Sequence, residues 1–262
     1  MAADHEQTNW WDQAPADWAE NERLCLPLYA ATLDAAGLAP GSRLLDLGCG
    51  AGTALRLAAD RGLRVAGLDA AAALVELARA LVPEADVRTG DLGALPFADH
   101  SVEGVTLVNA LQYAADPVAT LTEAARVVVS GGVVVVVTWG KPDRCESRFA
   151  MAAVRRLGPS PAPGPPSGGG PFGLGAPGRL AEVFAAADLV VRSDGEIGCG
   201  FRYPDLESAL RTQLASGPAR RTVASVGEPA VRAALAEAMQ LTREADGSFR
   251  QHNVFRCVVG RT

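Results

Sequence analysis

Residues 44–52, with the sequence Leu44-Leu45-Asp46-Leu47-Gly48-Cys49-Gly50-Ala51-Gly52, decide the fold of this 262-residue chain. Apolar residues around one acid run directly into three glycines at alternate positions. The pattern predicts a buried strand, a tight turn without side chains, and a helix that begins near Thr53. Glycine is needed where backbone must lie flat against a ligand, and the start of a helix offers free N–H groups. The stretch therefore predicts a ligand-binding turn, with a purely structural strand-turn-helix as the alternative.

The spacing of the glycines separates two kinds of nucleotide-binding turn. The dinucleotide fingerprint G-x-G-x-x-G would place its third glycine at position 53, which is Thr53 here. The chain instead reads G-x-G-x-G, with Asp46 two residues before the first glycine. This motif resembles motif I of the class I S-adenosylmethionine (SAM) dependent methyltransferases, in the small-molecule group that includes UbiE.

The resemblance extends over about residues 40–140 and is specific as a set of segments. A second strand over 64–69 ends in an acid, and a third short strand precedes Gly90-Asp91-Leu92. A fourth strand is predicted over 102–109, a helix with Asp116 as N-cap follows it, and a fifth strand covers 133–138. The resemblance implies an α/β fold: a doubly wound seven-stranded sheet with an antiparallel last strand, plus helical cap elements.

The same resemblance implies SAM as cofactor, S-adenosylhomocysteine (SAH) as product, and a set of cofactor-binding residues. Asp46 is expected to order the methionine end, Asp69 to hold the ribose hydroxyls, and Asp91 to take the adenine amino group. Asn109 is expected to face the methionine amine. The full predicted cofactor set is Asp46, Gly48, Cys49, Gly50, Gly52, Asp69, Ala70, Asp91, Leu92 and Asn109.

Residues for the acceptor are predicted from position. Many related O-methyltransferases carry a histidine just past the fourth strand, where this chain has Gln112 and Tyr113. Neither is a good base near pH 7, so we expect them to orient an acceptor that is already nucleophilic. Trp10, Tyr29 and Trp139 are the predicted substrate-binding residues, with simple packing as the alternative for the N-terminal aromatic residues.

Composition and charge narrow the function. The net charge of −6 gives no field that would attract nucleic acid, and no apolar run reaches membrane-spanning length. The five cysteines and three histidines form no metal-ligand spacing, so we predict no metal and free thiols in the cytoplasm. Only Lys141 is a lysine among 24 basic residues, which hints at a high-GC bacterial genome and favours an enzyme of natural product biosynthesis.

The organisation predicted is one SAM-binding domain over 1–262. It comprises N-terminal helices (1–38), the cofactor-binding core (40–140), a linker or lid (141–178) and a helical cap insertion (200–245). Residues 158–178 include seven prolines and eight glycines and are expected to form a lid or a spacer. The leading function is methylation of a small molecule. The alternatives are a cyclase, decarboxylase or SAM hydrolase of the same fold, or a non-catalytic SAM-binding partner. Whether the chain forms a homodimer or binds a partner protein stays open.

Overall fold

A seven-stranded sheet forms the centre of the computed structural model, which describes residues 10–159 and 170–262. The strand order is β3-β2-β1-β4-β5-β9-β6, and β9 lies antiparallel between β5 and β6. This confirms the predicted doubly wound sheet with an antiparallel last strand. The strands are β1 (Arg43–Leu47), β2 (Arg64–Asp69), β3 (Asp86–Thr89), β4 (Val102–Val108), β5 (Val128–Trp139), β6 (Val190–Gly198) and β9 (Val254–Arg261).

Burial follows the position of each strand in the sheet. In β5 the run Val133–Val137 is buried at every residue, as expected for a central strand covered on both faces. In β6, at one edge, most side chains are exposed. The continuous valines therefore place β5 in the middle of the sheet, with the parallel strands on one side and the antiparallel pair on the other.

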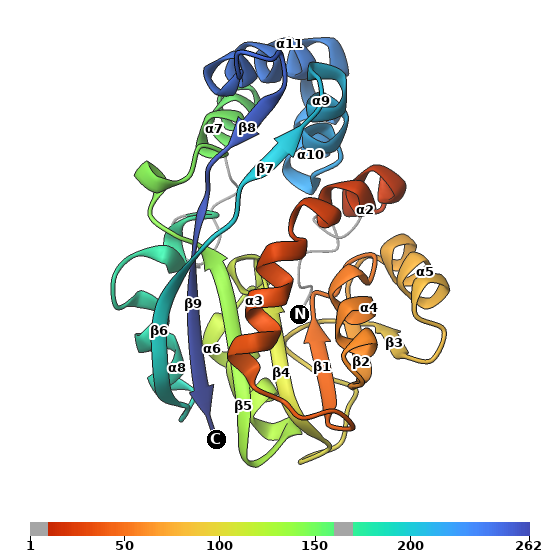
Figure 1. Ribbon diagram of the computed structural model, residues 1–262, viewed down its shortest axis with the longest axis vertical. Helices are drawn as coiled ribbons and strands as arrows, with labels where there is room; N and C mark the ends of the chain where they lie inside the picture. Colours follow the sequence, from red (N-terminus) through yellow and green to blue (C-terminus); the bar gives the residue numbers. More distant parts are fainter. Residues whose placement is uncertain (1–9, 160–169) are drawn as a thin grey trace.

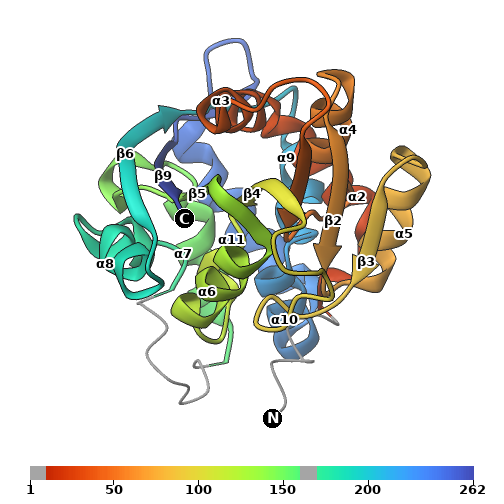
Figure 2. The same ribbon diagram turned by 90° about the horizontal axis from the view of Figure 1, so that it is seen from below.

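Helices cover both faces of the sheet, with α3, α4 and α5 on one face and α6 and α8 on the other (Figure 2). The prediction that Asp116 caps the helix after β4 is confirmed, since its carboxylate accepts from the backbone N–H groups of Val118 and Ala119. The helices around the sheet are α2 (Pro15–Leu24), α3 (Leu26–Ala36), α4 (Thr53–Asp60), α5 (Ala72–Leu81), α6 (Pro117–Val127) and α8 (Arg179–Ala186).

A cap lies beyond the carboxyl ends of the parallel strands, and α2 lies between the cap and the sheet (Figure 1). The apolar core of the cap joins α7, α9, α10 and α11 through residues such as Val154, Leu210 and Leu235. The cap elements are α7 (Arg148–Leu157), β7 (Phe201–Tyr203), α9 (Leu206–Leu214), α10 (Gly217–Val226), α11 (Glu228–Met239) and β8 (Phe249–Gln251).

The sequence predicted α9 and α11 but omitted α10 and the two-stranded sheet β7–β8. Both omissions have a physical reason. β7 and β8 have three residues each, which is too short for a periodic signal. α10 opens with Gly217-Pro218, a pair that reads as a turn, although proline is well suited to the first turn of a helix.

Part of the predicted lid, residues 160–169, lies outside the described residues. Residues 173–175 form a short 3₁₀ turn, and Gly175 lies so close to the carbonyl of Trp139 that a Cβ would collide with it. No helix within residues 10–159 and 170–262 combines the length and apolar character needed to cross a membrane.

Candidate cofactor and acceptor site

The glycine loop between β1 and α4 has a backbone that only glycine adopts readily. Gly48, Gly50 and Gly52 have φ values of 76°, 55° and 88°. A Cβ at Gly48 would collide with Ala110, and one at Gly52 with the backbone of α5. Gly48 therefore lets the end of β1 approach the residue that follows β4 by two positions, and Gly52 lets the start of α4 approach α5, independently of any ligand.

Asp46 and Asp69 flank this loop from the adjacent strands β1 and β2. Asp46 is 4% exposed and accepts a 2.6 Å hydrogen bond from the Thr106 hydroxyl on β4. Burial raises the pKa of Asp46 to about 7, against the opposing effect of that bond. Asp69 accepts from the backbone N–H groups of Gly50 (2.9 Å) and Ala71 (2.9 Å), and burial raises its pKa as well.

Two further carboxylates reach this region from the N-terminal segment, and the sequence analysis missed both. Glu22 of α2 accepts from Ala51 N–H at 2.7 Å and Thr53 N–H at 3.4 Å, so it caps α4. Asp12 accepts from Ala73 N–H at 2.8 Å in the first turn of α5. Neither α4 nor α5 has a side-chain cap from its own N-cap residue. That absence was the one local signal that carboxylates would come from a distant part of the chain.

Glu22 lies directly on the glycine loop. Its Oε1 would be 2.0 Å from a Cβ at Gly50, and the residue is only 4% exposed. Burial raises its pKa to about 7, and Asp69 contributes to the same shift. In the part of the chain that the structure describes, none of Glu22, Asp46 and Asp69 forms an ion pair with a cationic side chain.

An aromatic cluster closes the same region from the side of the N-terminal segment. Trp11 packs edge-on against Trp18, with ring centroids 4.4 Å apart, and against Tyr113 at 5.8 Å. Trp11 also touches Gly217 of the cap, where a Cβ would be 2.7 Å from the indole. Tyr113, a predicted acceptor residue, is thus joined through Trp11 to both the cap and the N-terminal segment. Burial raises the pKa of Tyr113 to about 12, so it is a poor base.

Gln112 and Asn109 form a second polar group at the carboxyl end of β4. Asn109 has a left-handed backbone (φ 54°), a conformation that asparagine tolerates better than most residues. The Gln112 amide nitrogen donates to Asn109 Oδ1 at 3.5 Å, and its oxygen accepts from the Thr138 hydroxyl at 3.2 Å. Gln112 is buried, and its position links the ends of β4 and β5.

The other predicted cofactor residues occupy different environments. Asp91 is exposed and accepts from Gly93 N–H in a tight turn, while the neighbouring Leu92 packs against the core. Ala70 is exposed. The Cys49 side chain is buried in the core cluster that includes Leu55 of α4, so only its backbone faces the loop.

The predicted substrate-binding residues do not form one cluster. Trp139 packs against Phe172, Phe201 and Phe255 at the junction of sheet and cap. Tyr29 lies against the same apolar cluster. Trp10 is partly buried, and its indole nitrogen has no hydrogen-bond partner among the described residues. Trp11 and Trp18 pack against the cluster that contains Ala51 and so lie beside the glycine loop.

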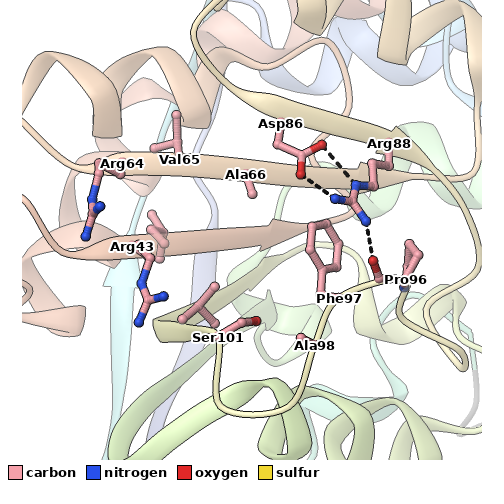
Figure 3. A pocket seen from close by; sticks show the side chains of 12 residues that line it. Arg43, Arg64, Val65, Ala66, Asp86, Arg88, Pro96, Phe97, Ala98 and Ser101 are labelled. Atoms are coloured by element: carbon pink, nitrogen blue, oxygen red, sulfur yellow. Dashed lines mark hydrogen bonds and ion pairs between the residues drawn. The ribbon is translucent and has the colours of Figure 1, made fainter.

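A groove of about 400 Å³ lies at the opposite edge of the sheet, at the amino ends of the parallel strands (Figure 3). Its arginines are already engaged: Arg43 pairs with Glu103, Arg88 pairs with Asp86, and Arg64 donates to the carbonyl of Gly41. Ligands of doubly wound sheets bind at the carboxyl ends of the strands. We therefore assign the candidate site to the glycine loop and not to this groove.

Histidine, cysteine and acidic side chains are also candidate metal ligands or bases. Within residues 10–159 and 170–262, no group of three or more histidine, cysteine or acidic side chains is arranged to hold a metal ion. The five cysteines are free and buried. His100 lies before β4, away from the carboxyl edge, and His252 lies beside the start of β9.

Comparison with known proteins agrees with this geometry. A chain from the Haloferax volcanii complex with the Trm112 methyltransferase activator superimposes with a TM-score of 0.60 at 22% identity, covering 98% of this chain and 97% of that one. The geranyl diphosphate C-methyltransferase of Streptomyces coelicolor, solved with SAH, gives 0.59 at 17% identity over 100% and 99%. The fold is therefore that of the class I methyltransferases.

Sequence comparison adds a more specific similarity, which is confined to the core of the chain. Residues 45–136 match the methyltransferase domain family. The demethylmenaquinone methyltransferase of Renibacterium salmoninarum is 38% identical over 110 residues, which are 42% of this chain and 46% of that protein. The aligned segment thus spans less than half the length of that relative. Over these residues the chain is similar to the class I SAM-dependent methyltransferases, in the group that contains these UbiE-like proteins.

Proposed function

We propose that the chain binds SAM at the glycine loop and transfers its methyl group to a small-molecule acceptor, of the kind made in bacterial secondary metabolism. The observation that carries the proposal is the set of three carboxylates around a side-chain-free loop: Glu22 and Asp46, which are buried, and Asp69, which is partly buried. A site lined by these carboxylates, which accept hydrogen bonds, fits a ligand that carries positive charge and hydroxyl groups, as SAM does.

The residues at the loop fit the parts of SAM separately. Each oxygen of Asp69 accepts one backbone N–H, which leaves further lone pairs for the ribose hydroxyls. Among the described residues Asp46 accepts one hydrogen bond, from Thr106, and its position on β1 suits the methionine end. Asp91 and Leu92 are proposed for the adenine, and Asn109 for the methionine amine.

When bound, SAM supplies a methyl group made electrophilic by its sulfonium. The chain then has to align an acceptor and exclude water, and alignment alone contributes about 7–11 kcal/mol. Gln112 and Tyr113 are proposed to orient the acceptor. Because Gln112 is an amide and Tyr113 has a pKa of about 12, the acceptor must bring its own nucleophile, such as an amine, an enol carbon or an acidic hydroxyl.

Purified protein, SAM labelled in the methyl group, and a panel of quinols, phenols, amines and enols test this proposal. Label in the acceptor together with SAH formation supports methyl transfer. SAM consumption with an unmethylated product would instead indicate a cyclase, decarboxylase or hydrolase. SAM binding without turnover, even with candidate partner proteins present, would leave a non-catalytic SAM-binding protein.

A further inference from the structure

Glu22 belongs to α2 and therefore lies outside the unit of β1, glycine loop and α4 that supplies most of the site. Its carboxylate caps α4 through Ala51 and Thr53 and lies on Gly50. The same helix is held to the cap, since Arg211 of α9 pairs with Asp17 and Glu20. The position of Glu22 is therefore fixed from both sides.

The charge of Glu22 is not needed for the capping alone. An uncharged amide oxygen would also accept a hydrogen bond from Ala51 N–H. A carboxylate in this place is costly, because it is buried near Asp69 and has no cationic partner among the described residues. The arrangement becomes favourable when a cation enters the site.

SAM and SAH differ by one methyl group and one positive charge, since SAM is a sulfonium and SAH a neutral thioether. Contacts to the ribose, the adenine and the amino-acid end are the same for both ligands. A negative charge held beside the loop therefore acts on the difference between the cofactor and its product. We propose that Glu22 is a specificity-determining residue that makes the site prefer cationic SAM over neutral SAH and so assists release of the product.

This inference rests on the proposed function, and calorimetry of both ligands tests it separately. Glu22→Gln keeps an oxygen for Ala51 N–H and removes the charge. Glu237→Gln, the same change at an exposed position of α11 in the cap, is the matched control. At pH 8 we expect Glu22→Gln to weaken SAM binding about tenfold and SAH binding less than threefold, the scale of one partly screened unit charge. The control should change neither.

Equal losses for SAM and SAH in Glu22→Gln, or no loss for either, would overturn the inference without contradicting the proposed function. If wild type binds neither ligand, the proposed function itself fails. A second measurement needs no variant, in case Glu22→Gln does not fold. Titrations of wild type at pH 7 in buffers of different ionisation enthalpy should show more protons released by SAM than by SAH. Equal proton release would also contradict the inference.

Discussion

The glycine loop and the cap are both buried and polar, but they contain opposite kinds of groups. Around the loop lie the carboxylates Glu22, Asp46 and Asp69, each with a raised pKa. Inside the cap lies a neutral network in which Gln251 accepts from Ser147 and Tyr203. The carboxylates at the loop have no cationic partner among the described residues, whereas the oxygen of Gln251 accepts two hydrogen bonds from neutral neighbours. From this difference we propose that the loop responds to ligand charge and that the cap network stabilises the fold.

Replacement of Asp69 should have the largest effect on SAM binding. Asp69→Asn removes the charged acceptor proposed for the ribose and weakens the bond to Gly50 N–H, so SAM affinity should fall about 10- to 100-fold. Calorimetry with SAM measures this directly. Asp86→Asn, on the edge strand at the opposite end of the sheet, should leave the affinity unchanged. Equal affinities for Asp69→Asn and wild type would remove Asp69 from the site.

The pH dependence of SAM binding should be the next largest effect. In the free protein, burial raises the pKa of Glu22 and Asp46 to about 7, and a cation favours their ionised forms. SAM affinity relative to SAH should therefore rise about three- to tenfold between pH 6 and pH 8. SAH has the same amino-acid end, so it corrects for titration of the ligand amine. A flat ratio would show that the loop does not respond to charge.

The surroundings of Glu22 support assigning that titration to carboxylates. Burial raises the pKa of Cys25, Tyr29 and Cys49 above their ordinary values, so these groups stay neutral in this range. Asp69 and Asp46 titrate with Glu22 as a coupled set, and Arg211 is engaged with Asp17 and Glu20.

The stability of the free protein should depend on pH in the opposite direction to SAM binding. Because the folded pKa values are raised, the stability of the free protein is highest below about pH 4 as far as these groups decide it, and this contribution is lost as pH rises through 7.

Gln112 should affect turnover and leave cofactor binding nearly unchanged. Gln112→Ala removes the link between Asn109 and Thr138, and we expect kcat/KM to fall about 10- to 100-fold, the scale of one lost hydrogen bond in the transition state. SAM affinity should change less than threefold. Thr138→Val tests whether the role is positioning, because it frees Gln112 without removing it. A wild-type rate in both variants would assign Gln112 to packing.

The sequence predicted the parts of the site that are local and missed the parts that come from distant segments. Asp46, Asp69 and the three glycines lie within one strand-loop-helix-strand unit, so their spacing alone places them together. Glu22 meets Ala51 across 29 residues, and nothing in α2 marks that contact. Its only trace in the sequence is the lack of a local cap on α4.

The acceptor side was harder to predict for a related reason. Trp10, Tyr29 and Trp139 were chosen as aromatic residues near the expected cleft, but aromatic residues serve packing and binding equally well. The structure puts Trp139 among phenylalanines and puts Trp11 beside Tyr113. Which tryptophan faces the loop depends on where the N-terminal segment docks, and that depends on tertiary contacts such as those of Asp12 and Glu22.

Replacement of Gln251 should have no effect on SAM affinity and a clear effect on stability. Gln251 is fully buried, and its oxygen accepts from Ser147 at 2.9 Å and Tyr203 at 3.4 Å. Gln251→Met leaves two buried hydroxyl groups without that acceptor, which costs about 1–3 kcal/mol. For a chain of this size that corresponds to a Tm lower by about 2–12 °C. Gln240→Met, the same change at an exposed position, should lower Tm by less than about 1 °C, as is usual at the surface.

Thermal unfolding and SAM calorimetry on the same samples separate the two regions. If Gln251→Met weakened SAM binding tenfold at a temperature where it is folded, the cap network would be part of the cofactor site. The contrast between a charged binding end and a neutral structural end would then be wrong.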